Sequence, residues 1–323
     1  MRRFLAITLV YIMLAVILTG CSQYSTGSDG NISVVCTSFP QYDWTRQILG
    51  DKTDNFELVL LMNNWTDLHN YQPTVDDIIK ISTCDLFIYV GGESDKWVDD
   101  ALKGATNKKM VIINLLDVLG HSVKMEEITE GMEGEHRDEH GSDETEYDEH
   151  VWLSLKNAQV FCAVIENTLA SLDVDHAGEY MSNLNEYTDR LSALDAEYRT
   201  TVDAAPINTL LFGDRFPFRY LLDDYGLDYH AAFAGCSTET EAGFDTIIFL
   251  TKKVNELSLN NIIVTENSDK KIAETIIRES TSKNQQILVL NAMQSLTVND
   301  VQNGITYLSI MESNLNVLKA ALQ

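Results

Sequence analysis

One uninterrupted helical pattern in the middle of the chain constrains the fold most. Residues 175–204 contain no proline and, after Gly178, no glycine. Within this range, leucine and tyrosine side chains recur at three- and four-residue steps, as on one face of a helix: Tyr180, Leu184, Tyr187, Leu191, Leu194 and Tyr198. About 28 helical residues at 1.5 Å each would span ~42 Å, more than a crossover between adjacent strands needs. The pattern therefore predicts a linking helix, residues 175–204, between two separate units.

Strand-like apolar runs alternate with helical patterns on both sides of this helix. Four runs precede it and four follow it: 32–39, 56–62, 86–91, 110–115, 209–214, 229–235, 261–266 and 286–292. Such alternation is typical of βαβ units and parallel sheets. We predict an α/β fold with an N-terminal lobe (32–174) and a C-terminal lobe (205–323), each a parallel four-stranded sheet flanked by helices. Ligands of such folds bind at the carboxyl ends of the strands, so a site is expected in the cleft between the lobes.

The beginning of the chain has the pattern of an export signal. A positive start, with Arg2 and Arg3, precedes a short apolar run that falls below the ~20 residues needed to cross a bilayer. The Leu-Thr-Gly sequence before Cys21 resembles the lipobox of bacterial lipoproteins, in which that cysteine becomes the lipidated first residue. We predict a leader (1–20), lipidation at Cys21, a polar tether (21–31) and an extracytoplasmic location on the bacterial cell membrane. An ordinary secreted protein is the alternative.

Charge and cysteine spacing limit the classes of partner. The formal net charge of −26 argues against nucleic acid and anionic lipid surfaces as partners, and it favours a cationic ligand. The cysteines beyond Cys21 are widely separated and form no C-x-x-C pair: Cys36, Cys84, Cys162 and Cys236. Buried free thiols are expected, although export makes one disulfide an alternative.

Two histidines together suggest a metal site. His69 lies in a polar loop after the second predicted strand, two residues beyond Asp67, and His150 directly follows Glu149. A neighbouring carboxylate can orient an imidazole for metal binding. Either histidine alone would be interpreted as an ordinary exposed or structural residue. The pair, each with its carboxylate, favours a metal site.

Five motifs spread over nearly the whole chain resemble the zinc- and manganese-binding lipoproteins of ABC metal importers. They are TDLHNYQPTVDDI, DLFIYVGGESDKWV, DEHVWLSLKNA, YLLDDYGLDYHAAFAG and GITYLSIMESNLNVLKAAL. The resemblance implies two α/β lobes, a rigid connecting helix and a metal site between the lobes. It implies that His69 and His150 bind the metal. It also implies a monomer that delivers the captured ion to a membrane permease and its ATPase.

Two positions depart from that family's pattern at the other half of the implied site. Arg215 and Gln294 stand where the family commonly carries a histidine or glutamate and an aspartate or glutamate. Arginine stays protonated and cannot ligate a cation. Asp214, at the end of a predicted strand, is the candidate replacement ligand, unless it pairs with Arg215 structurally. Glu241 is a further candidate ligand and Glu266 also follows a strand, with a helix-terminal acid and a solvated turn as the alternatives.

The expected donor set favours zinc. Two neutral imidazoles with one or two carboxylates suit Zn²⁺, and Mn²⁺ is the alternative because oxygen ligands favour harder ions. Copper(I) would call for thiolates or thioethers. The cysteines lie mostly in apolar runs rather than beside the histidines in sequence, so copper is not expected.

An acidic segment with scattered histidines, residues 121–149, leads up to His150. It contains His121, His136 and His140 and lacks strong apolar periodicity. A His- and acid-rich loop is common at this place in the family that the chain resembles. Two interpretations stay open: an antenna that gathers cations near the cleft, and a solubilising insert.

The function predicted from these features is capture and delivery of a divalent metal, without catalysis. A surface adhesin or structural lipoprotein that retains the fold with a degraded metal site is the alternative. A zinc hydrolase is a further one, because Glu149 or Glu241 could act as a general base. However, the sequence contains no H-E-x-x-H, G-x-S-x-G or Walker motif, so we expect no enzyme.

Overall fold

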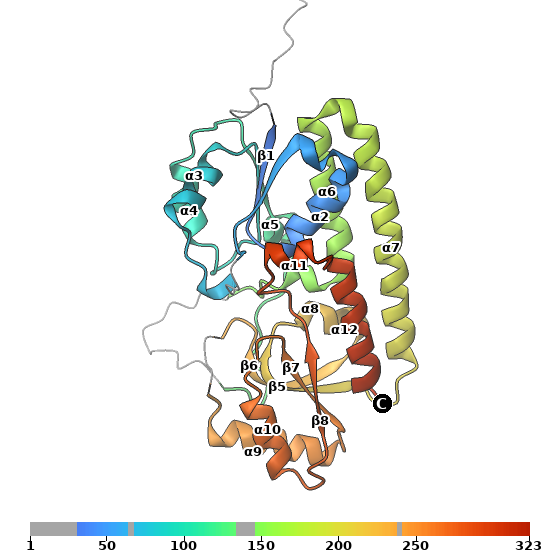
Figure 1. Cartoon of the computed structure of the whole chain (residues 1–323). Helices are drawn as coiled ribbons and strands as arrows, with labels where there is room; N and C mark the ends of the chain where they lie inside the picture. Colours follow the sequence, from blue (N-terminus) through green and yellow to red (C-terminus); the bar gives the residue numbers. More distant parts are fainter. Residues whose placement is uncertain (1–30, 64–67, 134–145, 238–240) are drawn as a thin grey trace, which may run out of the picture.

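The computed structural model describes residues 31–63, 68–133, 146–237 and 241–323. It contains two parallel four-stranded sheets, in the orders β2-β1-β3-β4 and β6-β5-β7-β8 (Figure 1). The strands are β1 (Ile32–Cys36), β2 (Phe56–Leu60), β3 (Leu86–Tyr89), β4 (Val111–Asn114), β5 (Thr209–Phe216), β6 (Asp228–Ala234), β7 (Asn261–Thr265) and β8 (Gln286–Leu290). The predicted fold class is confirmed. The residue boundaries of the two lobes stay predictions.

Helices flank both sheets and follow the strands in alternation. They are α2 (Phe39–Leu49), α3 (Val75–Thr83), α4 (Trp97–Lys103), α5 (Leu115–Leu119), α6 (Leu155–Leu172), α8 (Arg219–Tyr225), α9 (Phe244–Glu256), α10 (Lys271–Glu279), α11 (Val298–Gln302) and α12 (Tyr307–Ala321). Short 3-10 helices add η2 (Gly50–Asn55), η3 (Leu68–Asn70), η4 (Gly120–Ser122), η5 (Val151–Leu153) and η6 (Val174–His176). Within the described ranges, no helix is both long and apolar enough to cross a membrane.

Parallel pairing brings the functional loops to one edge of each sheet. In the N-terminal sheet, the central strand β1 pairs with β2 and β3, and Val34 lies opposite Leu58 and Leu86. Because all strands run the same way, the loops after β2 and β3 emerge at the same edge. In Figure 1 the chain passes from this edge toward the second sheet. The site described below lies at this junction.

The start of α2 differs from the sequence prediction. Residues 32–39 were expected to form the first strand, but β1 ends at Cys36 and α2 begins at Phe39. Ser38 and Gln41 form a capping box, and Pro40 occupies the first turn, where its missing N–H costs no helical hydrogen bond. The capping signal therefore outweighed the apolar run.

The linking helix is α7 (Ala177–Asp203), close to the predicted range. Its six periodic leucine and tyrosine side chains are all buried, and it packs on α6, α2 and α12. The Tyr198 hydroxyl donates to the Met311 carbonyl in α12 at 2.6 Å. In Figure 1, α7 runs alongside both sheets, so one rigid element spans the two lobes.

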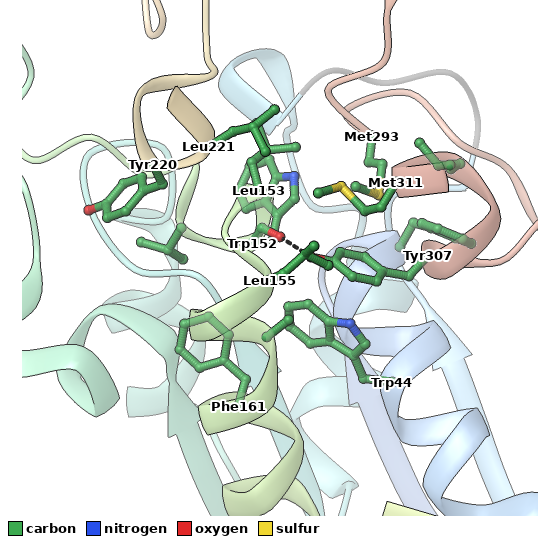
Figure 2. Close-up of a cluster of buried hydrophobic side chains, with 14 of the residues drawn as sticks. Trp44, Trp152, Leu153, Leu155, Phe161, Tyr220, Leu221, Met293, Tyr307 and Met311 are labelled. Atoms are coloured by element: carbon green, nitrogen blue, oxygen red, sulfur yellow. Dashed lines mark hydrogen bonds between the residues drawn. The ribbon is translucent and has the colours of Figure 1, made fainter. Parts of the chain in front are cut away.

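One apolar core continues from the first lobe into the second. Trp44 is fully buried, with its ring 5.6 Å from Phe161 and 5.1 Å from Tyr307. Figure 2 shows the Tyr307 hydroxyl bonded to the Trp152 carbonyl, a contact of 2.7 Å. The Trp152 indole N–H donates to the Ala292 carbonyl at 2.9 Å. Since these contacts join α2, α6 and η5 to α12 and to the loop after β8, large hinge motion would cost buried apolar area.

Several sequence predictions lie outside the described residues. They concern the leader, lipidation at Cys21, nearly all of the tether, Asp67, and the histidines His136 and His140. The remaining cysteines, Cys36, Cys84, Cys162 and Cys236, all carry free thiols. No disulfide therefore forms among these four. Three of them are buried as expected, whereas Cys236 is only partly buried.

Candidate metal centre

His69 projects toward the second lobe from the carboxyl edge of the first sheet. It lies in η3, which the buried side chain of Leu68 anchors. Its Nδ1 is 2.8 Å from Ser94 Oγ and 3.8 Å from a carboxylate oxygen of Glu149. These partners favour a proton on Nδ1, which leaves the lone pair of Nε2 available. That nitrogen is 3.3 Å from Nε2 of His150.

His150 is held by the residue two positions before it. The histidine is fully buried, and its ring Nδ1 and its backbone N–H both contact Asp148 Oδ1 at 2.9 Å. Burial alone lowers the pKa of His150, but the carboxylates of Asp148, Glu149 and Glu126 together outweigh burial and raise it. The Asp148 contact fixes Nδ1 as the donor, so His150 Nε2, like His69 Nε2, carries a lone pair at the point where the two rings meet.

Glu149 orients the other histidine. Its side chain is buried, and one carboxylate oxygen accepts a hydrogen bond from the Ser94 backbone at 2.8 Å. Burial raises the pKa of this carboxyl group, while hydrogen bonds from Ser94 lower it. Gly92 makes room for this side chain, since a Cβ on Gly92 would lie 2.3 Å from Glu149 Oε1. The sequence assigned Glu149 to His150, but in the structure Asp148 contacts the His150 ring and Glu149 lies beside His69 instead.

Gln294 reaches the histidines from the second lobe. Its Nε2 is 2.9 Å from Nε2 of His150 and 3.3 Å from Nε2 of His69. Glu266 fixes the loop that carries it, because the two oxygens of Glu266 accept the backbone N–H groups of Ala292 at 2.8 Å and Gln294 at 3.1 Å. Glu266 therefore positions the loop, and Gln294, regarded in the sequence as a lost ligand, is the side chain that faces the histidines.

Cys236 is the residue that the sequence analysis missed. His69, His150 and Cys236 form a group whose potential ligand atoms lie within 4.8 Å of one another. The expectation that the thiols lie away from the histidines is therefore wrong for Cys236. A signal was present: Cys236 comes just after β6, at the same kind of strand end that was used to select Asp214 and Glu266.

The structure does not bring Asp214 or Glu241 into this group. Asp214 Oδ2 accepts from the backbone N–H and the hydroxyl of Thr265 at 3.1 and 2.8 Å, and Oδ1 accepts from the Arg215 backbone N–H at 2.8 Å. Both Asp214 oxygens therefore brace strand ends. Glu241 is exposed. Asp214 and Arg215 do line a cleft of about 290 Å³ that also contacts Asn70, the neighbour of His69.

The described parts of the acidic loop are tied to the body of the protein. The Glu126 backbone N–H donates to the Glu146 carbonyl at 2.9 Å, and Glu133 accepts from Gly243 at 2.8 Å. These contacts fix the described ends of the segment, and the antenna and the solubilising insert both stay open as interpretations. His121 is exposed on η4 and lies outside the histidine group.

Asp148 offers a test of how the site is oriented. In Asp148→Asn the shape persists but the negative acceptor for His150 Nδ1 is weakened, and we expect zinc affinity to fall about 10- to 100-fold. Competition titration against a chelator measures this change. Asp224→Asn, which contacts Ser154 and Lys156 away from the histidines, is the control and should bind as the unchanged protein does. Equal affinities in both variants would contradict the orienting role.

The two lobes and the donor atoms at their junction define a two-lobed substrate-binding protein with a candidate metal centre. Residues 34–321 match the family described as "Zinc-uptake complex component A periplasmic", and the chain belongs to this family. The expectation of a non-enzymatic protein is thereby confirmed, because the family consists of metal-binding components of importers.

Named relatives and solved structures agree with this membership. The chain is 31% identical to the high-affinity zinc uptake system protein ZnuA of Bacillus subtilis, over 97% of this chain and 94% of the relative. It is 31% identical to the zinc-binding lipoprotein AdcA of Streptococcus pneumoniae over 94% of this chain, but it spans only 58% of that relative's length. The metal-dependent lipoprotein YcdH of Bacillus subtilis superposes with a TM-score of 0.72 at 29% identity, covering 90% of this chain and 99% of YcdH. The Zn(II)-bound ZnuA-like domain of AdcA gives 0.69 at 28% identity, covering 91% and 99%.

Proposed function

We propose that the protein captures Zn²⁺ between its lobes, with His69 and His150 as ligands, and delivers it to the permease and ATPase of an ABC importer. The carrying observation is the 3.3 Å separation of the two Nε2 atoms. Two nitrogens bound to one tetrahedral zinc at about 2.0–2.1 Å lie about 3.3–3.4 Å apart. The histidines therefore already have the spacing that zinc imposes.

The surroundings of the histidines also favour a cation. Asp148 and Glu149 lie on the Nδ1 sides of the two rings, and the partly buried Glu126 lies close enough to His150 to raise its pKa. The formal charge of the whole chain is −26. A negative field around two aligned lone pairs raises the local concentration of cations and opposes anions.

Membrane attachment through a lipid on Cys21 is part of the proposal. Cys21 lies outside the described residues, so support comes from the lipobox-like sequence and from relatives that are named lipoproteins. A tethered monomer at the outer face of the cytoplasmic membrane would keep the captured ion near its permease.

Among the alternatives, no feature of the described residues favours an adhesin or a hydrolase. The adhesin alternative depended on decay of the metal site through Arg215 and Gln294. Instead, Gln294 contacts both histidines, and Arg215 Nη1 lies 3.4 Å from the Ser237 carbonyl, in the turn beside Cys236. Arg215 and Gln294, the two residues that depart from the family pattern, therefore both contact residues of the candidate metal centre or of the turn beside it.

Metal titration of the purified, chelator-stripped protein tests the proposal. We expect one zinc ion to bind with submicromolar affinity, corresponding to more than about 8 kcal/mol, and Mn²⁺ to bind more weakly. Isothermal titration with each ion measures both values. If neither ion binds more tightly than the millimolar range, the transport function is excluded. Tighter binding of Mn²⁺ than Zn²⁺ would retain a metal-import function and reject zinc as the cargo.

A further inference from the structure

Cys236 occupies a place from which it can complete the metal site. Its Sγ belongs to the group of potential ligand atoms, together with one nitrogen each of His69 and His150, that lie within 4.8 Å of one another. In a tetrahedral site with Zn–S of about 2.3 Å and Zn–N of about 2.0–2.1 Å, sulfur and nitrogen are about 3.5 Å apart. The thiol therefore needs to move by no more than about 1.4 Å to share an ion with both histidines.

The donor set needs a negative ligand. His69, His150 and Gln294 are neutral when they bind a cation, and a dication in a partly buried site is costly without a compensating charge. Asp148 contacts the His150 ring, Glu149 accepts from the Ser94 backbone with its second oxygen 3.8 Å from His69 Nδ1, and Asp214 accepts from Thr265. Within the described part of the chain, Cys236 is the only anion-forming side chain grouped with both histidines.

The turn that carries Cys236 is held in place from three directions. Its backbone N–H donates to Glu126 Oε1 at 2.8 Å, and Arg215 Nη1 lies 3.4 Å from the carbonyl of the next residue, Ser237. Gly235 packs directly on the His150 ring. A Cβ at this position would lie 3.0 Å from His150 Cε1 and 2.8 Å from the Phe216 carbonyl. Arg215, which cannot ligate, thus helps to position the residue that can.

A cysteine thiol with an ordinary pKa of about 8.5 is mostly protonated at neutral pH when no metal is bound. A coordinating metal ion reverses this preference, since a thiol bound to it is deprotonated outright. The reaction is balanced by release of one proton to solvent as the zinc–sulfur bond forms.

We propose that Cys236 is a zinc ligand from the C-terminal lobe that makes the site selective for thiophilic cations over Mn²⁺. This inference rests on the proposed function. With the two histidines and the amide oxygen of Gln294, which a half-turn of the amide brings toward the histidines, Cys236 gives a four-coordinate site with two nitrogens, one oxygen and one sulfur. Thiolate favours zinc, whereas manganese prefers oxygen ligands, so the thiol accounts for the choice between the two cargoes.

Cobalt(II) in place of zinc reports directly on sulfur ligation. We expect the full-length protein loaded with Co²⁺ to show a cysteinate-to-cobalt charge-transfer band in the near ultraviolet. Cys236→Ser should lose this band, and Cys84→Ala, which removes a buried thiol in the core of the first lobe, should keep it. If Cys236→Ser fails to fold, the spectrum of the unchanged protein still tests sulfur ligation, because a missing charge-transfer band excludes it.

Selectivity supplies the second measurement. In Cys236→Ser we expect the ratio of zinc to manganese affinity to fall at least tenfold, with circular dichroism as the folding control. Cys236→Asp replaces the sulfur by a charged oxygen donor, so its zinc affinity should largely survive while its manganese affinity rises. A protein that binds zinc but shows no thiolate band with cobalt, or an unchanged ratio in Cys236→Ser, overturns this inference and leaves the proposed function intact. Absence of zinc binding by the unchanged protein overturns both.

Discussion

Replacing His150 by alanine is expected to weaken zinc binding by more than about 100-fold, which corresponds to about 2.7 kcal/mol. The substitution removes a donor atom whose orientation the Asp148 contact has already fixed, so no pre-organised nitrogen remains on that side of the ion. It also leaves His69 as the only imidazole among the grouped ligand atoms. The measurement is a chelator-competition titration, expressed per folded molecule.

A matched control is available just before α7, away from the histidine pair. His176, in η6, is partly exposed, and its Nδ1 contacts Asp173 at 2.7 Å. His176→Ala should therefore keep the zinc affinity of the unchanged protein. If His150→Ala binds zinc within about threefold of the control, or about 0.7 kcal/mol, the histidine pair is not the primary site.

The fold was predictable because its signals are local and repeated. Each sheet strand is a short apolar run, and the unbroken pattern from 175 to 204 excludes a simple crossover. Where two local signals competed, the prediction failed: the apolar run 32–39 suggested a strand that continues to Phe39, whereas β1 ends at Cys36 and a helix capped by Ser38 begins at Phe39. Both signals were in the sequence, and the cap was the more specific one.

The site was only half predictable, for a physical reason. His69 and His150 stand out because each follows a carboxylate by one or two residues, although the structure pairs His150 with Asp148 and places Glu149 beside His69. Cys236 and Gln294 have no such local partner. The groups that fix their loops, Glu126 for Cys236 and Glu266 for Gln294, are separated from them by 110 and 28 residues. Strand order and turn geometry bring these pairs together, and neither can be read from spacing along the chain.

Asp214 was selected from the sequence as a ligand, but the structure does not group it with the histidines. It has the right chemistry and lies at the carboxyl end of its sheet, yet Thr265 on the neighbouring strand takes both remaining lone pairs of Oδ2. A carboxylate that already accepts hydrogen bonds at both oxygens gains less from a cation than a group without such partners. The residue type of Asp214 and its place at a strand end were therefore not enough to identify it as a ligand, because the partner on the neighbouring strand was not known.

Trp44→Ala is expected to lower the free energy of unfolding by about 3–5 kcal/mol, because it opens a cavity in a fully packed apolar region. Trp44→Phe should cost much less. The indole nitrogen has no hydrogen-bond partner among the described residues, so phenylalanine sacrifices packing volume but no hydrogen bond. Urea unfolding of the metal-free protein, followed by circular dichroism, measures both variants.

The shape of this transition tests whether the two lobes are one cooperative unit. Trp44 in α2 packs against Tyr307 at the start of α12, and Tyr307 in turn donates to the Trp152 carbonyl. Because these contacts tie elements of both sheets into one core, the metal-free Trp44→Ala protein should unfold in a single transition at a lower urea concentration. Two separated transitions, with only the first shifted by the substitution, would show that the lobes fold independently. In that case the rigidity of the junction would have to come from α7 rather than from the shared core.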